Sequence, residues 1–193
     1  RLSTSEAVLN DLAMVYRGMG RLAEADAALE SALSLNSDFP PTHNNRGRIR
    51  AQMGDFVGAE EAFSQAIRVQ PDFTGPYTNL ANLLAGRGDF DLAQGYLERA
   101  IGQGVPADPG LANVRSLLGD VLAARGQTEQ ARVQYQTALT IDPNLAPAQF
   151  GLGSVLASQG NIAEAIVQFQ EAALSGDIGL RRASLAAIQE LRQ

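Results

Sequence analysis

Side chains that could carry out covalent or metal chemistry are scarce in this sequence. His43 is the only histidine, and there is no cysteine and no lysine among the 193 residues. A nucleophilic triad needs a base beside its serine, and a zinc site needs three or four imidazole or thiolate ligands. One histidine supplies neither set. We therefore interpret His43 as a structural or surface residue, and we expect no metal site and no cofactor.

Two glycine-containing stretches, at residues 18–23 and 102–107, match the pattern G-x-G-x-x-A of dinucleotide-binding turns. Neither follows a predicted strand, as such a site requires, so we interpret both as helix ends. A Walker-type phosphate loop needs lysine, which is absent. The adjacent acids Glu60 and Glu61 fall on an amphipathic helical pattern, where a solvated face accounts for them. The sequence therefore predicts a protein without catalytic activity.

The charge balance restricts the partners. Fifteen basic residues, all arginine, stand against 21 acidic ones, which gives a net charge of -6. Nucleic acid and anionic lipid both select a basic face, so we expect neither as a partner. No run of about 18 apolar residues occurs, and we expect no membrane insertion. Exclusive use of arginine is typical of a GC-rich bacterial genome, and the lack of cysteine fits either cytoplasm or periplasm. Because the chain begins at Arg1, we interpret it as a fragment or a processed chain.

The elements that must position any binding residue come from an internal repeat. Glycine recurs at intervals of 34, 34, 38 and 34 residues, at Gly20, Gly54, Gly88, Gly126 and Gly160. Alanine stands five positions after each glycine, at Ala25, Ala59, Ala93, Ala131 and Ala165, and twelve positions after it, at Ala32, Ala66, Ala100, Ala138 and Ala172. A large apolar residue stands nine positions after it, at Leu29, Phe63, Leu97, Tyr135 and Phe169. A period of this kind indicates a helical-repeat protein.

Each unit is predicted to be two helices joined by a tight turn. The recurring glycine permits a positive φ after the first helix. In the second helix, the alanines and the large apolar residue are spaced by four and three positions, which places them on one face. Small side chains on that face let neighbouring helices approach closely, while the large one fills the space between them.

These features resemble the tetratricopeptide repeat, and the resemblance covers almost the whole chain. It implies an all-α fold, a right-handed superhelical solenoid of antiparallel helix pairs. The family pattern gives a single domain over residues 1–193, with repeats at 6–39, 40–73, 74–111, 112–145 and 146–179 and a capping helix at 180–192. Two departures stand out. Four extra residues separate the third repeat from the fourth, and Arg46 and Arg50 replace the usual apolar residues, with heads that we expect to reach solvent or nearby Glu60 and Glu61.

In this family, a concave groove is lined mainly by first-helix residues at the second, fifth, sixth and ninth positions of each unit. The resemblance therefore implies a set of partner-binding candidates, namely Asn10, Asn44, Asn45, Arg48, Thr78, Asn79, Asn82, Ser116, Asp120, Phe150 and Ser154. Most of them are polar and uncharged, and an asparagine amide offers both donors and an acceptor to a peptide main chain. The competing interpretation is that these polar residues only keep a solvent-exposed helix face soluble. Phe150, an aromatic residue predicted in a concavity, is a hot-spot candidate, unless it packs against the helix of Asp120.

The set Asn45, Asn79 and Asn82 resembles the asparagine ladder in the repeats of O-linked N-acetylglucosamine transferases, which grips peptide main chain. The likeness covers the second and third units only, because Leu117 and Gly151 follow in the later ones. The carboxylate clamp of other family members needs lysine, so we exclude that function.

Three functions remain open at this stage. The first is a non-catalytic protein–protein interaction scaffold that takes a peptide or a partner subunit in its groove. The second is the repeat region of a larger enzyme, such as a glycosyltransferase. The third is a structural subunit of a multiprotein assembly.

Overall fold

The computed structural model describes residues 5–103 and 110–192. Within these ranges all regular secondary structure is α-helical, which confirms the expected fold class. The helices are α1 (Glu6–Gly18), α2 (Leu22–Leu35), α3 (Pro40–Gln52), α4 (Phe56–Val69), α5 (Thr74–Gly86), α6 (Phe90–Gln103), α7 (Gly110–Ala124), α8 (Thr128–Ile141), α9 (Ala146–Ser158), α10 (Ile162–Ala173) and α11 (Ile178–Glu190). Most of the insertion expected after the third repeat lies outside the described residues.

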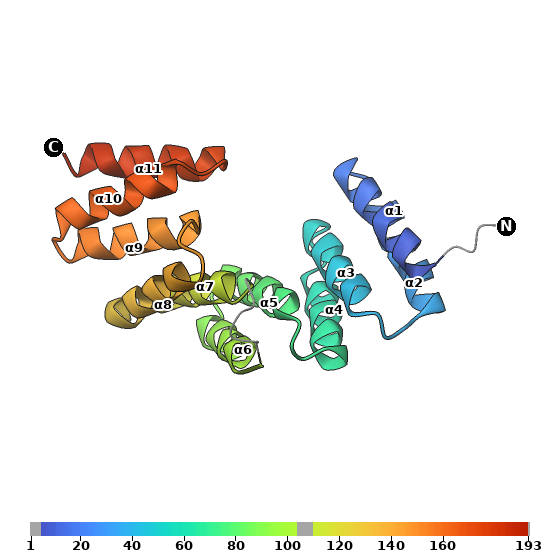
Figure 1. Cartoon of the computed structure of the whole chain (residues 1–193). Coiled ribbons are helices and arrows are strands. Elements are labelled where there is room, and N and C mark those ends of the chain that lie inside the picture. Colours follow the sequence, from blue (N-terminus) through green and yellow to red (C-terminus); the bar gives the residue numbers. More distant parts are fainter. Residues whose placement is uncertain (1–4, 104–109, 193) are drawn as a thin grey trace. The chain divides into compact units, whose positions relative to one another are not determined.

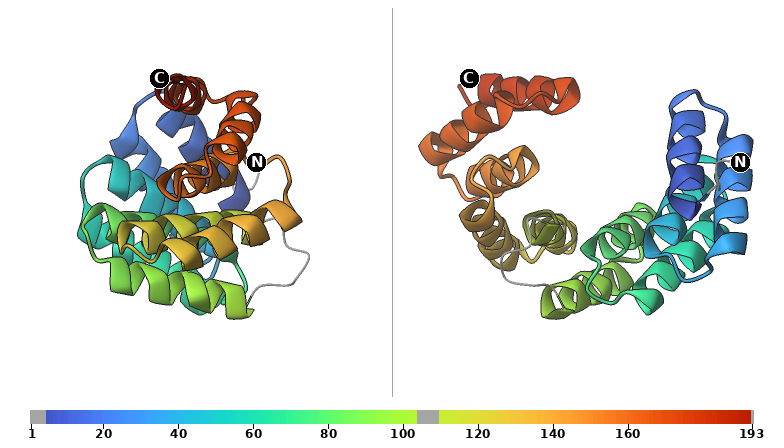
Figure 2. Two further views of the ribbon diagram at one scale, coloured as in Figure 1. Left: turned by 90° about the vertical axis from the view of Figure 1, so that its left-hand side faces the viewer. Right: turned by 45° about the vertical axis from the view of Figure 1, so that its right-hand side comes forward.

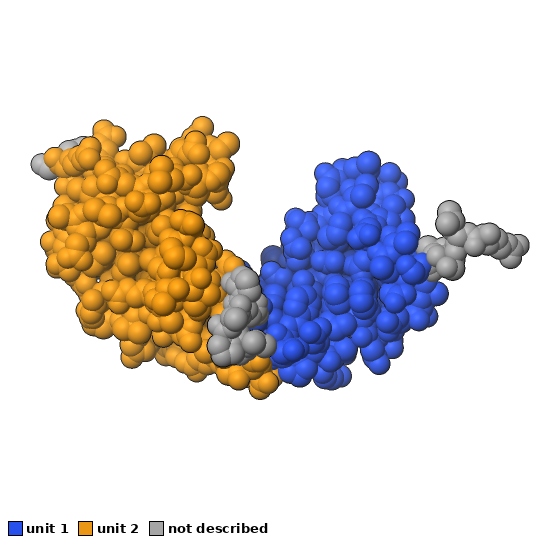
Figure 3. All heavy atoms as spheres, in the orientation of Figure 1, with its two compact units in different colours: residues 1–88 blue, residues 89–193 orange. Residues whose placement is uncertain are grey.

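The chain divides into two compact units, coloured separately in Figure 3. Unit 1, residues 1–88, contains α1 to α5, and unit 2, residues 89–193, contains α6 to α11. Inside each unit, a helix packs against the helices just before and just after it in the chain (Figures 1 and 2). First helices also contact each other across one repeat, α1 with α3 and α7 with α9. Unit 1 therefore contains the helix pairs α1/α2 and α3/α4 followed by α5, and unit 2 contains α6, the pairs α7/α8 and α9/α10, and α11.

The tight turns confirm the prediction made from the recurring glycines. All five adopt a positive φ, between 74° at Gly126 and 85° at Gly88. In the fifth repeat, the N–H of Asn161, just after Gly160, donates to the carbonyl of Leu156 at 2.9 Å. This hydrogen bond satisfies one of the last carbonyls of the first helix and reverses the chain, as a Schellman motif does. The turn fixes the angle at which the second helix returns.

The repeat positions form the core of each unit. Every alanine of the two recurring sets is fully buried, and the large apolar residues between them are buried. The residue of the first helix that faces this large side chain differs in size from repeat to repeat. A Cβ built on Gly47 would lie 2.5 Å from the Phe63 ring, whereas Ala13 shares a core cluster with the smaller Leu29. Helix spacing is thus maintained by pairing glycine with an aromatic ring or alanine with leucine.

Candidate functional site

In unit 1, asparagine side chains on successive first helices are hydrogen-bonded to each other. The Nδ2 of Asn45 on α3 donates to the Oδ1 of Asn10 on α1 at 2.8 Å. The Nδ2 of Asn79 on α5 donates to the Oδ1 of Asn44 on α3 at 2.9 Å. Asn10 in turn donates from its own Nδ2 to the Oγ1 of Thr42. We call the four asparagines the amide ladder; it joins three consecutive first helices through side chains one repeat apart.

The four amides of the ladder have two different roles. Asn10 and Asn44, at the fifth position of their repeats, are only 6% and 9% exposed, so they act as supports. Asn45 and Asn79, at the sixth position, are half-buried and are held by them. An asparagine amide carries two N–H donors and one carbonyl oxygen. Because one N–H of each is used on the support, Asn45 and Asn79 keep one donor and one acceptor in a fixed orientation.

The other candidates in unit 1 lie outside this network. Asn82 is exposed on α5. The Thr78 hydroxyl donates to the Thr74 carbonyl of its own helix at 2.9 Å and so faces the backbone. Arg48 is half-buried, and burial, followed by the charge of nearby Arg17, lowers the pKa of its guanidinium. An arginine remains charged in spite of such a shift.

In unit 2, three of the candidates line one hollow. Asp120 of α7 lies with Phe150 and Ser154 of α9 around a cavity of about 410 Å³. We call this cavity the aromatic pocket; its other lining residues are Ala123, Thr128, Tyr135, Gly151, Val155 and Ser158. The last candidate, Ser116, is buried, and its Oγ has no hydrogen-bond partner among the described residues. The structure therefore gathers Asp120, Phe150 and Ser154 and leaves Ser116 inside the helix packing.

Tyr135 of α8 organises the aromatic pocket. Its hydroxyl donates to the Oδ1 of Asp120 at 2.7 Å, and its ring is buried. Burial raises the pKa of Tyr135, and the charge and hydrogen bond of Asp120 raise it further. Asp120 is exposed as a residue, yet surrounding protein atoms displace water from its carboxyl group and raise its pKa, against a smaller lowering by Tyr135. Phe150 completes the wall, with its ring centroid 5.3 Å from that of Phe169.

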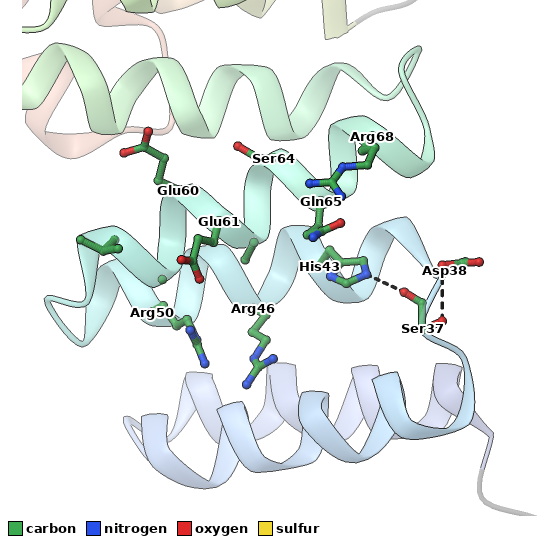
Figure 4. A pocket seen from close by; sticks show the side chains of 13 residues that line it. Ser37, Asp38, His43, Arg46, Arg50, Glu60, Glu61, Ser64, Gln65 and Arg68 are labelled. Atoms are coloured by element: carbon green, nitrogen blue, oxygen red, sulfur yellow. Dashed lines mark hydrogen bonds between the residues drawn. The ribbon is translucent and has the colours of Figure 1, made fainter.

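A larger hollow, of about 890 Å³, lies over α3 and α4 in unit 1, and none of the predicted partner-binding residues lines it (Figure 4). Its only histidine is His43, whose Nε2 donates to the Ser37 carbonyl at 2.7 Å. Both acidic and basic side chains line it, among them Asp38, Glu61 and Arg68. Because charges of both signs line it, this hollow favours no one class of charged ligand and is a weaker candidate than the other two sites.

The arginines of this hollow correct one expectation from the sequence. Arg46 pairs with Asp26 of α2 at 3.0 Å, and Arg50 lies 3.5 Å from the same carboxylate. Glu60 is instead paired with Arg87, at 3.0 Å. The expected reach of both arginines toward Glu60 and Glu61 is therefore wrong, because α2 packs beside α3 and presents Asp26 at a shorter distance.

Two residues that matter for these sites were not among the candidates, namely Thr42 and Tyr135. The repeat pattern assigns Tyr135 to the core only, and the structure places its ring between two glycines of the first helices, Gly119 and Gly151. A Cβ on either glycine would lie within 2.5 Å of its ring. The sequence gave no reason to select Thr42, because no hydroxyl residue stands at its position in the other repeats.

The described residues add no sign of a metal or membrane site. Nowhere in residues 5–103 and 110–192 do three or more histidine, aspartate or glutamate side chains come together as metal ligands. Over the same ranges, no helix has the length and apolar character that a membrane span needs.

Fold and repeat pattern together define a helical-repeat protein, and comparison with known proteins gives its family. Tetratricopeptide-repeat models match residues 10–72 and 75–99, and a TPR repeat model matches residues 119–160. The chain belongs to the tetratricopeptide-repeat family. This fold serves as a protein–protein interaction scaffold with protein or peptide partners, and such scaffolds are generally non-catalytic.

Solved structures agree with this family. A thermophilic TPR protein of Thermus thermophilus is 22% identical, with a TM-score of 0.75 over 96% of this chain and 100% of its own. The pilF protein of Pseudomonas aeruginosa is 16% identical, with a TM-score of 0.81 over 96% and 88%. YrrB, a TPR protein with an unusual peptide-binding site, is 22% identical, with a TM-score of 0.65 over 96% and 91%. Among curated proteins, no sequence matches this chain. At these identities the likeness concerns the fold.

Proposed function

We propose that this chain is an interaction scaffold that binds an extended peptide segment of a partner protein along the first-helix face carrying the amide ladder. The observation that supports this most directly is the pairing of Asn10 with Asn45 and of Asn44 with Asn79. Both pairs join a fifth position to the sixth position of the next repeat. Each presents one amide donor and one amide acceptor, so the same polar pattern occurs twice, one repeat apart.

This pattern complements a peptide main chain. An extended strand offers alternating N–H and C=O groups, each of which needs a partner when water is displaced. Asn45 and Asn79 are already held by buried supports, so binding does not have to immobilise them, and that lowers the entropic cost of association. Asn82, which is exposed on the same helix as Asn79, adds a third amide without a structural duty in the ladder.

The test is affinity for peptides selected from a random phage-displayed library on the purified chain. We expect Asn82→Ala to weaken binding of the selected peptide about fivefold, since one hydrogen bond is lost and no buried group is left unpaired. Gln52→Ala, an exposed amide at the end of α3, is the matched control and should leave the affinity unchanged. Replacing peptide N–H groups by N-methyl groups should weaken binding more than replacing peptide side chains by alanine.

Two results would contradict the proposal. One is a selected peptide whose affinity responds equally to Asn82→Ala and to Gln52→Ala. The other is tolerance of N-methylation along the whole peptide, because a ladder that reads the main chain needs those protons.

A second candidate, a subunit of a larger assembly, is supported by the apolar face of α1. Val8 and Val15 are each 54% exposed, whereas Thr42 and Ile49, at the same positions of the next repeat, are 0% exposed. In that repeat, the preceding second helix α2 packs against α3. The face of α1 therefore has the character of a surface that accepts another helix.

Sedimentation velocity over a wide concentration range tests whether that helix comes from a second copy. Association that is abolished by Val15→Glu would support an assembly role. A monomer at all concentrations would remove self-assembly as a function and leave the scaffold proposal untouched.

A further inference from the structure

Three of the four hydroxyl groups that line the aromatic pocket donate to acceptors within the protein. Ser158 Oγ donates to the Val155 carbonyl at 2.7 Å, and Ser154 Oγ donates to the Phe150 carbonyl at 3.0 Å. Tyr135 donates to Asp120, and Thr128 faces the Gly126 carbonyl at a longer 3.5 Å. A hydroxyl has one proton, and the three distances of 2.7–3.0 Å are those of hydrogen bonds that use it. Three of the four lining hydroxyl groups are thus already engaged as donors within the protein.

What remains is a set of acceptors with one negative charge. The serine oxygens keep their lone pairs, and Oδ2 of Asp120 has no hydrogen-bond partner among the described residues. Asp120 carries the only charge on the lining, which contains no basic residue. The rest of the wall is apolar or aromatic, with Phe150, Val155 and Ala123. A wall in which open acceptors outnumber donors disfavours a carboxylate or a carbonyl and favours a group that is rich in donors.

We infer that the aromatic pocket binds a basic side chain, arginine or lysine, of the partner that the proposed scaffold recognises. A guanidinium or ammonium group donates several hydrogen bonds and accepts none, which matches the acceptors left open on the wall. Its charge complements Asp120, and the net charge of -6 on the whole chain favours a basic partner. Its alkyl stem suits the apolar wall, which includes the aromatic side chain of Phe150.

The inference rests on the proposed scaffold function but is carried by a different unit, so the two can fail separately. The amide ladder reads main chain in unit 1, and the aromatic pocket reads one side chain in unit 2. A test of the pocket therefore uses a probe too short to need the ladder.

The probe is a blocked pentapeptide, Gly-Gly-Arg-Gly-Gly, beside its lysine and citrulline analogues, titrated to millimolar concentrations against the ¹⁵N-labelled chain. We expect saturable amide shifts at Gly151, Ser154 and Ser158 with arginine and lysine. Citrulline, which has the shape of arginine without its charge, should bind about tenfold more weakly. Asp120→Asn keeps an acceptor for Tyr135 and should reduce arginine binding by about the same factor.

Glu190→Gln is the control, because it makes the same change of charge at an exposed position in the same unit. It should leave the arginine affinity as it is. The inference is overturned if no saturable shift occurs at these three residues, if citrulline binds as well as arginine, or if Asp120→Asn and Glu190→Gln act alike. Arginine binding with an inactive ladder would instead contradict the proposed peptide mode and leave the pocket standing.

Discussion

At the fifth and sixth positions of their repeats, the two units carry opposite side-chain chemistry on the same helical scaffold. In unit 1, Asn44 and Asn45 link α3 to its neighbours through amides. In unit 2, the same positions of α9 hold Phe150 and Gly151, and the ring of Tyr135 occupies the space where a side chain at residue 151 would begin. At residue 151 the position of the Tyr135 ring, and not the backbone repeat, therefore excludes a ladder side chain.

Installing a ladder residue in unit 2 should break this comparison most strongly. A Cβ on Gly151 would lie 2.4 Å from two carbons of the buried Tyr135 ring. We expect Gly151→Asn to lower the free energy of unfolding by about 3 kcal/mol, since overpacking outweighs the small gain in helix propensity. Urea denaturation measures the change.

Gly95→Asn on α6 is the matched control, because nothing lies within 4 Å of a Cβ there. It should be neutral or slightly stabilising. The combination of Gly151→Asn with Tyr135→Leu should recover part of the loss, since leucine lacks the ring atoms that clash. A Gly151→Asn chain as stable as Gly95→Asn would show that Tyr135 does not exclude the ladder from unit 2.

Removing a support should break the amide ladder itself. Asn10→Ala leaves the fully buried Thr42 and the Nδ2 of Asn45 without their partner. We expect a loss of about 2 kcal/mol in the free energy of unfolding, because buried polar groups that lose a partner are costly. Asn82→Ala, an exposed asparagine, should change stability by less than about 0.5 kcal/mol. Equal effects of the two variants would mean that the ladder does not stabilise unit 1.

Removing the hydroxyl group of Tyr135 tests how much its hydrogen bond to Asp120 stabilises unit 2. Tyr135→Phe keeps the ring against Gly119 and Gly151 and removes only the hydrogen bond to Asp120. The expected loss of stability is about 1 kcal/mol, the usual net value of such a bond. Thermal unfolding of the two chains at neutral pH measures it, and a loss as large as that of Gly151→Asn would point to ring packing that depends on the hydroxyl.

The parts of this molecule that follow from periodicity were predictable from the sequence. Each turn glycine and each core alanine recurs at a fixed spacing, and a pattern that repeats identifies both the helix pair and the face it buries. The directions in which single side chains point could not be predicted from the sequence. Arg46 and Arg50 turned to Asp26 because the choice of an ion-pair partner depends on distances of a few ångströms between helices.

The candidate site shows the same division between pattern and geometry. The family pattern selected Asn10 and Asn45 equally, yet one is a buried support and the other a half-buried amide that it holds. Asp120, Phe150 and Ser154 were selected separately, and only folding shows that they share a hollow with Tyr135. The direction of each hydrogen bond decides what a cavity can bind, and the spacing of residues in the sequence does not reveal that direction.

The smallest effect we predict is a pH dependence that separates the two kinds of site, since the ladder asparagines do not titrate. Surrounding protein atoms raise the pKa of Asp120 in the folded chain. Between its ordinary pKa of about 4 and the raised value, the folded state binds more protons than the unfolded state, so stability falls as pH rises through this window. The cost is fully present above the raised pKa. Asp120→Asn does not titrate there, so its stability relative to the natural chain should improve as pH rises through that window.

Urea unfolding of both chains over a pH series measures this difference. Glu24, whose pKa is lowered chiefly by its hydrogen bond from Arg21, has the opposite sign, but it is present in both chains and cancels. Glu190→Gln, compared with the natural chain in the same way, provides the reference for an exposed carboxylate. If the Asp120→Asn difference runs parallel to that of Glu190→Gln at every pH, the carboxyl group of Asp120 is not desolvated. The contrast between an uncharged ladder and a charged pocket would then rest on Tyr135 and Phe150 alone.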